Sequence, residues 1–154
     1  MRYVIDCEAT IAGDITSVWQ TWTDMPSFPD WDPREEVMRL DGPFAVGTTG
    51  WSKQRGGRGG SAFVLKIVEP QQRWANEIAL PGGHLTIDHT LAPVGVDKVH
   101  VVKRYCVDGP MAITFRLVFA REIRTHTPLT FNALETEAAR RRQQATGARP
   151  GPNP

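Results

Sequence analysis

Hydrophobic and polar residues alternate at the start of the chain. From Tyr3 to Ile11 every second residue is apolar or small, whereas the intervening positions include Asp6 and Glu8. A period of two with one polar side is typical of a half-buried β-strand. We therefore predict that residues 3–11 form the first strand of a sheet.

The period changes after Gly13. Apolar residues then recur at helical spacing, and Asp14 or Thr16 can serve as the N-cap, which predicts a helix over residues 15–23. Prolines at positions 26, 29 and 33 prevent a long continuation. Residues 26–32 are therefore expected to form a short helical turn or a loop.

Strand-like patterns return after residue 36. Segments rich in β-branched and aromatic residues are separated by turns that contain glycine, proline or aspartate. The predicted strands are 37–40, 47–54, 61–68, 73–80, 84–91 and 98–107. Together with the first strand they predict a seven-stranded antiparallel meander.

The last part of the chain has a helical period. From Met111 onward apolar residues recur at helical intervals with arginines between them, which predicts one long helix over residues 111–145. Residues 146–154 are rich in proline and glycine and are expected to be a disordered tail. The chain is thus predicted to be a single domain, residues 1–145, followed by this tail.

Composition excludes several functional classes. The 154 residues are 40% hydrophobic and 23% charged, as in an ordinary globular protein. The net charge of +1 gives no overall field that would recruit nucleic acid or an anionic membrane. No run of about 18 apolar residues is present, so we expect no membrane insertion. Two cysteines form no disulfide framework, and a cytoplasmic location is expected.

Short motifs occur in a fixed order along residues 3–140. They are the segment from Ala12 to Trp19, Asp24, Trp31-Asp32-Pro33, the Gly42–Gly47 turn, the Glu69-Pro70 turn, Gly109-Pro110, and Ile123, Pro128, Phe131 and Leu134 in the final helix. As an ordered set they resemble the START/Bet v 1-like (SRPBCC) superfamily, including its polyketide cyclase/dehydrase group.

The resemblance implies an α+β helix-grip fold. In this fold a seven-stranded antiparallel curved sheet surrounds a long C-terminal helix, and two short helices after the first strand close one end. Members of the superfamily enclose an apolar cavity; some catalyse cyclisation, dehydration or aromatisation inside it, and others only bind or transport. The resemblance therefore implies a hydrophobic small-molecule partner, while the fold alone leaves the function open.

His89 is the histidine that best fits an inward-facing position. It shares a strand face with Leu85, Ile87 and Leu91. Imidazole transfers protons near neutral pH, so His89 is a candidate base for forming an enolate from a carbonyl compound. The alternative is a partly buried structural histidine that is hydrogen-bonded to a neighbouring strand.

Three further polar residues are candidates for catalysis through a carbonyl group. Tyr105 on the last strand has a hydroxyl donor, and Asn76 shares a strand face with the apolar Trp74. Arg116 on the predicted long helix is a candidate for an acidic or carbonyl group. Each has a structural alternative: ring packing at the sheet edge for the tyrosine, a buried water for the asparagine, and a solvated helix face for the arginine.

Five aromatic residues are candidates for lining a ligand pocket. Trp51 and Trp74 lie in predicted central strands, where large rings can face a flat or long apolar ligand. Phe63 lies in a predicted strand between them, and Phe115 and Phe119 lie on the long helix. We expect all five to shape the pocket.

Recognised cofactor and metal motifs are missing from the sequence. There is no phosphate-binding glycine motif, nucleophile elbow or metal-ligand spacing, so we expect neither a cofactor nor a metal. The segment Arg55–Gly60 resembles an RGG element but lacks neighbouring aromatic residues. We therefore expect it to form a mobile loop at the cavity mouth, and expect no nucleic-acid partner.

These features favour a cyclase, aromatase or dehydratase that acts on a polyketide-type molecule, as in antibiotic biosynthesis. The alternative is a non-catalytic protein that binds or transports a hydrophobic ligand. An enzyme requires at least two polar side chains that converge on one ligand atom, whereas a carrier does not. The sequence leaves open whether the chain acts alone or as a homodimer.

Overall fold

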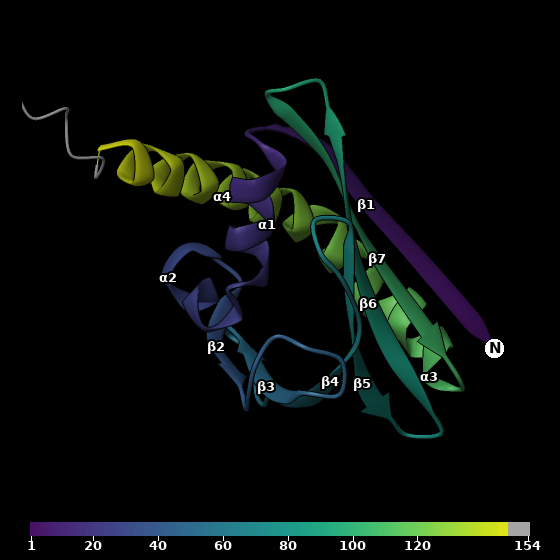
Figure 1. Ribbon diagram of the computed structural model, residues 1–154. Coiled ribbons are helices and arrows are strands. Elements are labelled where there is room, and N and C mark those ends of the chain that lie inside the picture. The colour runs from purple at the N-terminus through teal and green to yellow at the C-terminus, as the bar shows by residue number, and fades with distance from the viewer. Residues whose placement is uncertain (148–154) are drawn as a thin grey trace, which may run out of the picture.

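A computed structural model describes residues 1–147. Its sheet contains the seven strands β1 (Arg2–Ala12), β2 (Glu35–Leu40), β3 (Thr49–Gln54), β4 (Ser61–Glu69), β5 (Arg73–Leu80), β6 (Gly83–Val94) and β7 (Lys98–Asp108). All neighbouring strands are antiparallel, in the order β1-β7-β6-β5-β4-β3-β2. The predicted helix-grip meander is confirmed, and its first strand pairs with its last (Figure 1).

Short helices connect β1 to β2. Helix α1 spans Ile15–Thr23, and the carboxylate of Asp14 accepts a hydrogen bond from the backbone N–H of Ser17 at 3.0 Å, so the predicted N-cap is present. A 3₁₀ turn, η1 (Met25–Ser27), and a one-turn helix, α2 (Phe28–Trp31), follow. The prolines therefore break this segment into two short pieces without abolishing its helical conformation.

A helix that is continuous from residue 111 to residue 147 closes the described chain. It begins as α3 (Met111–Thr114), passes through a π-helical turn, η2 (Phe115–Phe119), and continues as α4 (Ala120–Gly147). Thr146 and Gly147 are still helical, so the predicted boundary at residue 145 is two residues early. The rest of the predicted tail, residues 148–154, lies outside the described residues.

The core lies between α4 and the inner face of the sheet, which is the face directed at this helix (Figure 1). In β1 the buried residues Ile5, Cys7 and Ile11 lie on the apolar side of the predicted alternation. Leu134 of α4 is fully buried in the same cluster. Helix α4 packs directly on β1 and α1, whereas β3 and β4 curve away from it (Figure 1), which leaves space on the inner face of the sheet.

Within residues 1–147 no helix is both long enough and apolar enough to cross a membrane.

Candidate functional site

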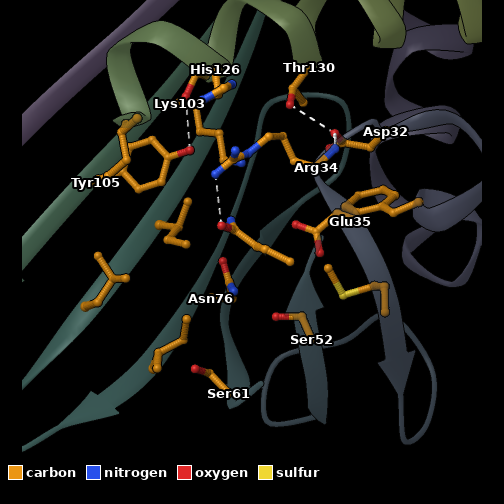
Figure 2. Close-up of a pocket in the computed structure, with 18 of the residues that line it drawn as sticks. Asp32, Arg34, Glu35, Ser52, Ser61, Asn76, Lys103, Tyr105, His126 and Thr130 are labelled. Atoms are coloured by element: carbon orange, nitrogen blue, oxygen red, sulfur yellow. Dashed lines mark hydrogen bonds between the residues drawn. The ribbon is translucent and has the colours of Figure 1, made fainter. Parts of the chain in front are cut away.

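A cavity of about 490 Å³ occupies the space between the sheet, the helix from Met111 onward, and the short helices after β1. Its size falls within the usual range for small-molecule sites. Much of its wall is apolar, with Met38, Leu80 and Ile87 among the lining side chains. Figure 2 shows that charged side chains gather at one end, where β7, β2 and α4 approach one another, and that neutral polar side chains continue toward the other end.

Lys103 and Tyr105 project into the cavity from the inner face of β7. Val101 and Val107, on the same face, are fully buried. The ammonium nitrogen of Lys103 lies 5.3 Å from the centre of the Tyr105 ring. The Tyr105 hydroxyl and Oγ1 of Thr127 are 3.3 Å apart, which links β7 to α4.

The charge state of Lys103 follows from its neighbours. Burial by itself disfavours the ammonium, but interactions with Tyr105, Asp32 and Glu35 outweigh burial, so the pKa of Lys103 is raised above its usual value. Lys103 is therefore a charged donor at neutral pH. It is suited to binding an oxygen that develops negative charge, and unsuited to acting as a neutral amine nucleophile.

Glu35, the first residue of β2, is the buried carboxyl group at this end of the cavity. Glu35 is only 9% exposed, and its Oε2 has no hydrogen-bond partner among the described residues. Burial raises the pKa of Glu35 to about 7; the charge of Lys103 lowers it in part, and the charge of Asp32 raises it further. A carboxyl with this pKa can take up or release a proton at neutral pH.

Asp32 is held in place next to Glu35. It lies at the end of α2 and is buried, and its Oδ1 accepts hydrogen bonds from the backbone N–H of Arg34 at 3.0 Å and from Oγ1 of Thr130 at 3.1 Å. The second bond ties the α2–β2 connection to α4 (Figure 2). The position of Asp32 beside Lys103 and Glu35 is therefore set by two elements.

Arg34 bridges the cavity's edge. Its guanidinium donates to the carboxylate of Glu122 on α4 at 2.8 Å and to the side-chain oxygen of Gln54 on β3 at 3.2 Å. All three residues line the cavity. Because the ion pair is partly exposed, its contribution to stability is small.

His89 lies on the inner face as predicted, but it is part of the wall. Its ring stacks on Trp74 with 3.5 Å between the ring centres and meets Trp22 edge-on at 5.0 Å. Burial, and then the charge of Lys103 on the adjacent strand position, lower the pKa of His89 well below its usual value. Its Nδ1 lies 3.3 Å from the backbone carbonyl oxygen of Trp74, to which it can donate a hydrogen bond.

Asn76 lies on the inner face of β5 and lines the cavity. Its residue is 7% exposed, and its Oδ1 is buried without a hydrogen-bond partner in residues 1–147. Buried amide groups are usually paired. Asn76 therefore presents unused hydrogen-bonding capacity toward the cavity.

The structure brings six of the nine predicted site residues to the cavity. These are His89, Tyr105, Asn76, Trp74, Phe115 and Phe119. Phe115 and Phe119 are four positions apart in the π-helical turn, and their rings are in contact at 5.2 Å between centres. The irregular helix therefore places two aromatic side chains over the pocket.

The structure places the other three predicted residues away from the cavity lining, and the expectation for them is corrected. Trp51 lies on the strand face opposite Ser52, and its ring covers the space beside Gly60. Phe63 is buried in the core, with its ring over Gly50 on the paired strand. Arg116 is exposed on the outer side of the π-helical turn.

Sequence reasoning missed Lys103, Glu35 and Asp32 as site residues. Lys103 gave a signal, because it interrupts a row of valines on the same strand face as Tyr105. The pattern of residues contained no signal for Glu35, because the second strand was expected to begin at residue 37 and the strand pairing is irregular between Glu35 and Val37. Asp32 appeared only within a turn motif.

No group of three or more His, Cys, Asp or Glu side chains in the described part of the chain is arranged to hold a metal ion.

Comparison with known proteins finds no matching family model and no matching curated protein sequence. Solved structures do match. The Zhui aromatase/cyclase from a Streptomyces species has a TM-score of 0.75 at 13% identity, covering 92% of this chain and 96% of that one. Norcoclaurine synthase from Thalictrum flavum has a TM-score of 0.70 at 13% identity, covering 88% and 86%. A START superfamily protein from Mycobacterium smegmatis has a TM-score of 0.67 at 11% identity, covering 89% and 97%.

These similarities establish the fold. The chain has the same helix-grip fold as these solved structures, as its motif order predicts. At 11% to 13% identity they do not transfer an activity from any of these proteins.

Proposed function

We propose that the protein is a cofactor-independent cyclase, aromatase or dehydratase that acts on a polyketide-type carbonyl compound in this cavity. The observation that carries the proposal is the presence of Glu35, Lys103 and Tyr105 at one end of an otherwise largely apolar pocket. Glu35 can exchange a proton at neutral pH, and Lys103 and Tyr105 can each donate a hydrogen bond to a substrate oxygen. This combination is what enolate chemistry requires.

A dehydration illustrates the roles. The carboxylate of Glu35 removes the proton α to the substrate carbonyl, and the electron pair moves onto the carbonyl oxygen as an enolate, which Lys103 and Tyr105 stabilise. The enolate then re-forms the carbonyl and a carbon–carbon double bond while the β-hydroxyl leaves. Glu35 returns its proton to that hydroxyl, so water departs and the carboxylate is regenerated.

Cyclisation uses the same groups. Glu35 takes the proton from the nucleophilic carbon, and the enolate carbon attacks a second carbonyl of the same chain. The new alkoxide receives the proton from Glu35, which gives a ring hydroxyl that the dehydration step can remove. Repeated cyclisation and dehydration leads to an aromatic ring without an external oxidant or reductant.

The remaining predicted residues take supporting roles in this proposal. His89 forms part of the pocket wall with Trp74 and orients the neighbouring side chains, because its neutral ring is stacked and hydrogen-bonded. Asn76 contributes a polar group that faces the substrate. Arg116 has no role in it, since it lies outside the cavity lining.

The test is the dehydration of an aryl β-hydroxyketone, followed by the absorbance of the conjugated enone. We expect turnover by the wild type and a rate reduced about a hundredfold or more in Glu35→Gln, as for the loss of a general base. Glu36→Gln is the matched control, because Glu36 is the next residue and is exposed. Equal rates in wild type and Glu35→Gln would refute the assignment of Glu35.

A carrier of a hydrophobic molecule is the second candidate. It is favoured by the apolar part of the wall, where Met38, Leu80 and Ile87 offer no catalytic group. A carrier would bind the hydroxyketone or its enone without changing either, and Glu35→Gln would alter affinity alone. Saturable binding with no turnover across a panel of β-hydroxyketones and poly-β-ketones would favour this function.

A further inference from the structure

Two buried oxygen atoms at the cavity lack hydrogen-bond partners in the described part of the chain. One is Oε2 of Glu35 and the other is Oδ1 of Asn76. Both residues line the same cavity, and both are less than 10% exposed. Since buried polar atoms in folded proteins are nearly always paired, these two oxygens indicate a missing partner from outside the chain.

The two side chains come from different parts of the sheet. Glu35 begins β2, and Asn76 lies in the middle of β5 opposite Ile87 of β6. Both residues line the same cavity, and Figure 2 shows that both side chains lie apart from the hydrogen-bonded pair of Asp32 with Thr130. A ligand in this cavity can therefore meet both groups.

The chemistry of the two groups limits what the ligand carries there. A carboxyl group accepts when ionised and donates when protonated, and an amide both accepts and donates. A hydroxyl matches both groups when Glu35 is protonated, because it can accept from the carboxyl and donate its one hydrogen to Oδ1 of Asn76. When Glu35 is ionised, that hydrogen can pair with only one of the two oxygens. An ether or a carbonyl oxygen only accepts, and a ligand carboxylate would be repelled by an ionised Glu35.

We propose that Glu35 and Asn76 form a subsite for a hydroxyl group of the ligand. This inference rests on the proposed function only in taking the cavity as the ligand site. With Lys103 and Tyr105 binding a carbonyl oxygen, it defines the ligand class as a neutral hydroxy-carbonyl compound. A hydroxyl at the subsite is also placed to receive a proton from Glu35 and leave as water.

The experiment compares two ligands that differ only in the hydroxyl. Binding of a naphthol and of the corresponding methoxynaphthalene is measured by quenching of tryptophan fluorescence, since Trp22 and Trp74 line the cavity. We expect the wild type to bind the naphthol about tenfold more tightly than the ether, as for one hydrogen bond to a buried polar group. Equal affinities, or no binding of either compound, would overturn the subsite.

Variants of Asn76 and Glu35 then test which residue causes the preference for the naphthol over the ether. Asn76→Leu is expected to lower the naphthol-to-ether ratio about threefold or more, and Glu35→Gln is expected to keep most of it, because glutamine still donates and accepts. Asn132→Leu on the exposed face of α4 is the matched control. An unchanged ratio in Asn76→Leu would overturn the role of Asn76. Asn76→Ser provides a second test if the leucine variant does not fold.

The outcomes separate this inference from the proposed function. A wild-type preference for the naphthol without turnover of β-hydroxyketones supports the subsite and refutes catalysis. Turnover that depends on Glu35, together with equal affinities for naphthol and ether, supports catalysis and overturns the subsite. Equal affinities are also the result expected if the two oxygens are paired only with an internal water.

Discussion

Replacing Glu35 with glutamine should change how stability depends on pH. The side chain is buried and its Oε2 has no hydrogen-bond partner within residues 1–147, so its charged form is disfavoured in the folded protein. In the unfolded chain the same carboxyl is solvated and has its ordinary pKa. Glutamine has nearly the same shape and cannot ionise. The difference between the two proteins therefore isolates the cost of ionising one buried carboxyl.

The sign and magnitude of this pH dependence follow from the raised pKa of Glu35. The pKa of Glu35 in the folded protein, about 7, lies above the ordinary value of 4.5, so between these pH values the folded protein binds more protons than the unfolded chain. Stability from this group is complete below pH 4.5 and is lost as pH rises to about 7. At about 1.4 kcal/mol for each pKa unit, the loss is about 3 kcal/mol.

Urea unfolding of both proteins at pH 4.5 and pH 8 measures the effect. We expect the free energy of unfolding of Glu35→Gln, relative to wild type, to increase by about 3 kcal/mol between these pH values. Glu36→Gln, with an exposed carboxylate, is expected to show no such increase. Parallel pH profiles for wild type and Glu35→Gln would show that Glu35 ionises normally, and the acid–base role would fail with it.

Three further predictions concern other parts of the site and fold. The buried His89 resists protonation, so the wild type should lose stability as pH falls below 6.5, the usual pKa of imidazole, and His89→Phe should reduce this loss. Urea unfolding at pH 5 and pH 7 measures it, and the same loss of stability in both proteins would contradict the prediction. Lys103→Met should lower enone formation about a hundredfold while fluorescence still reports ligand binding; a full rate would exclude Lys103 as an oxyanion donor. Gly50→Ala should destabilise the fold by about 1–3 kcal/mol in thermal unfolding, since a Cβ would lie 2.2 Å from the Phe63 ring, whereas Gly59→Ala, with nothing within 4 Å, should not.

The fold was predictable because strand phase and turn positions are local signals. The alternation around Ile5 placed the correct face of β1 inward, and the change of period after residue 110 located the long helix. The π-helical turn at Phe115–Phe119 was not predictable, because the pattern of apolar residues there fits an ordinary helix. Both phenylalanines that line the cavity lie in this turn.

The site was only partly predictable, because phase determines which face a side chain takes but not what covers it. Trp51 was expected to line the pocket because it lies in a central strand, but it points to the face of β3 opposite Ser52. Phe63 lies on the correct face, but its ring fills the space above Gly50. Glu35 is brought to the cavity by the break after α2, which no periodic signal describes. Predicting it required the three-dimensional arrangement.

The polar residues that interrupt apolar rows are the strongest argument that the cavity is functional. Lys103 lies between Val101 and Tyr105 on the inner face of β7, where another valine would complete the core. A buried ammonium and a buried carboxyl without a full set of partners reduce stability compared with apolar residues of similar size. Departures from the rules of core packing are expected at functional sites, and these two occur in one cavity. Lys103 and Glu35 line the same cavity, and the ligand site that we propose there accounts for both departures from a stable core.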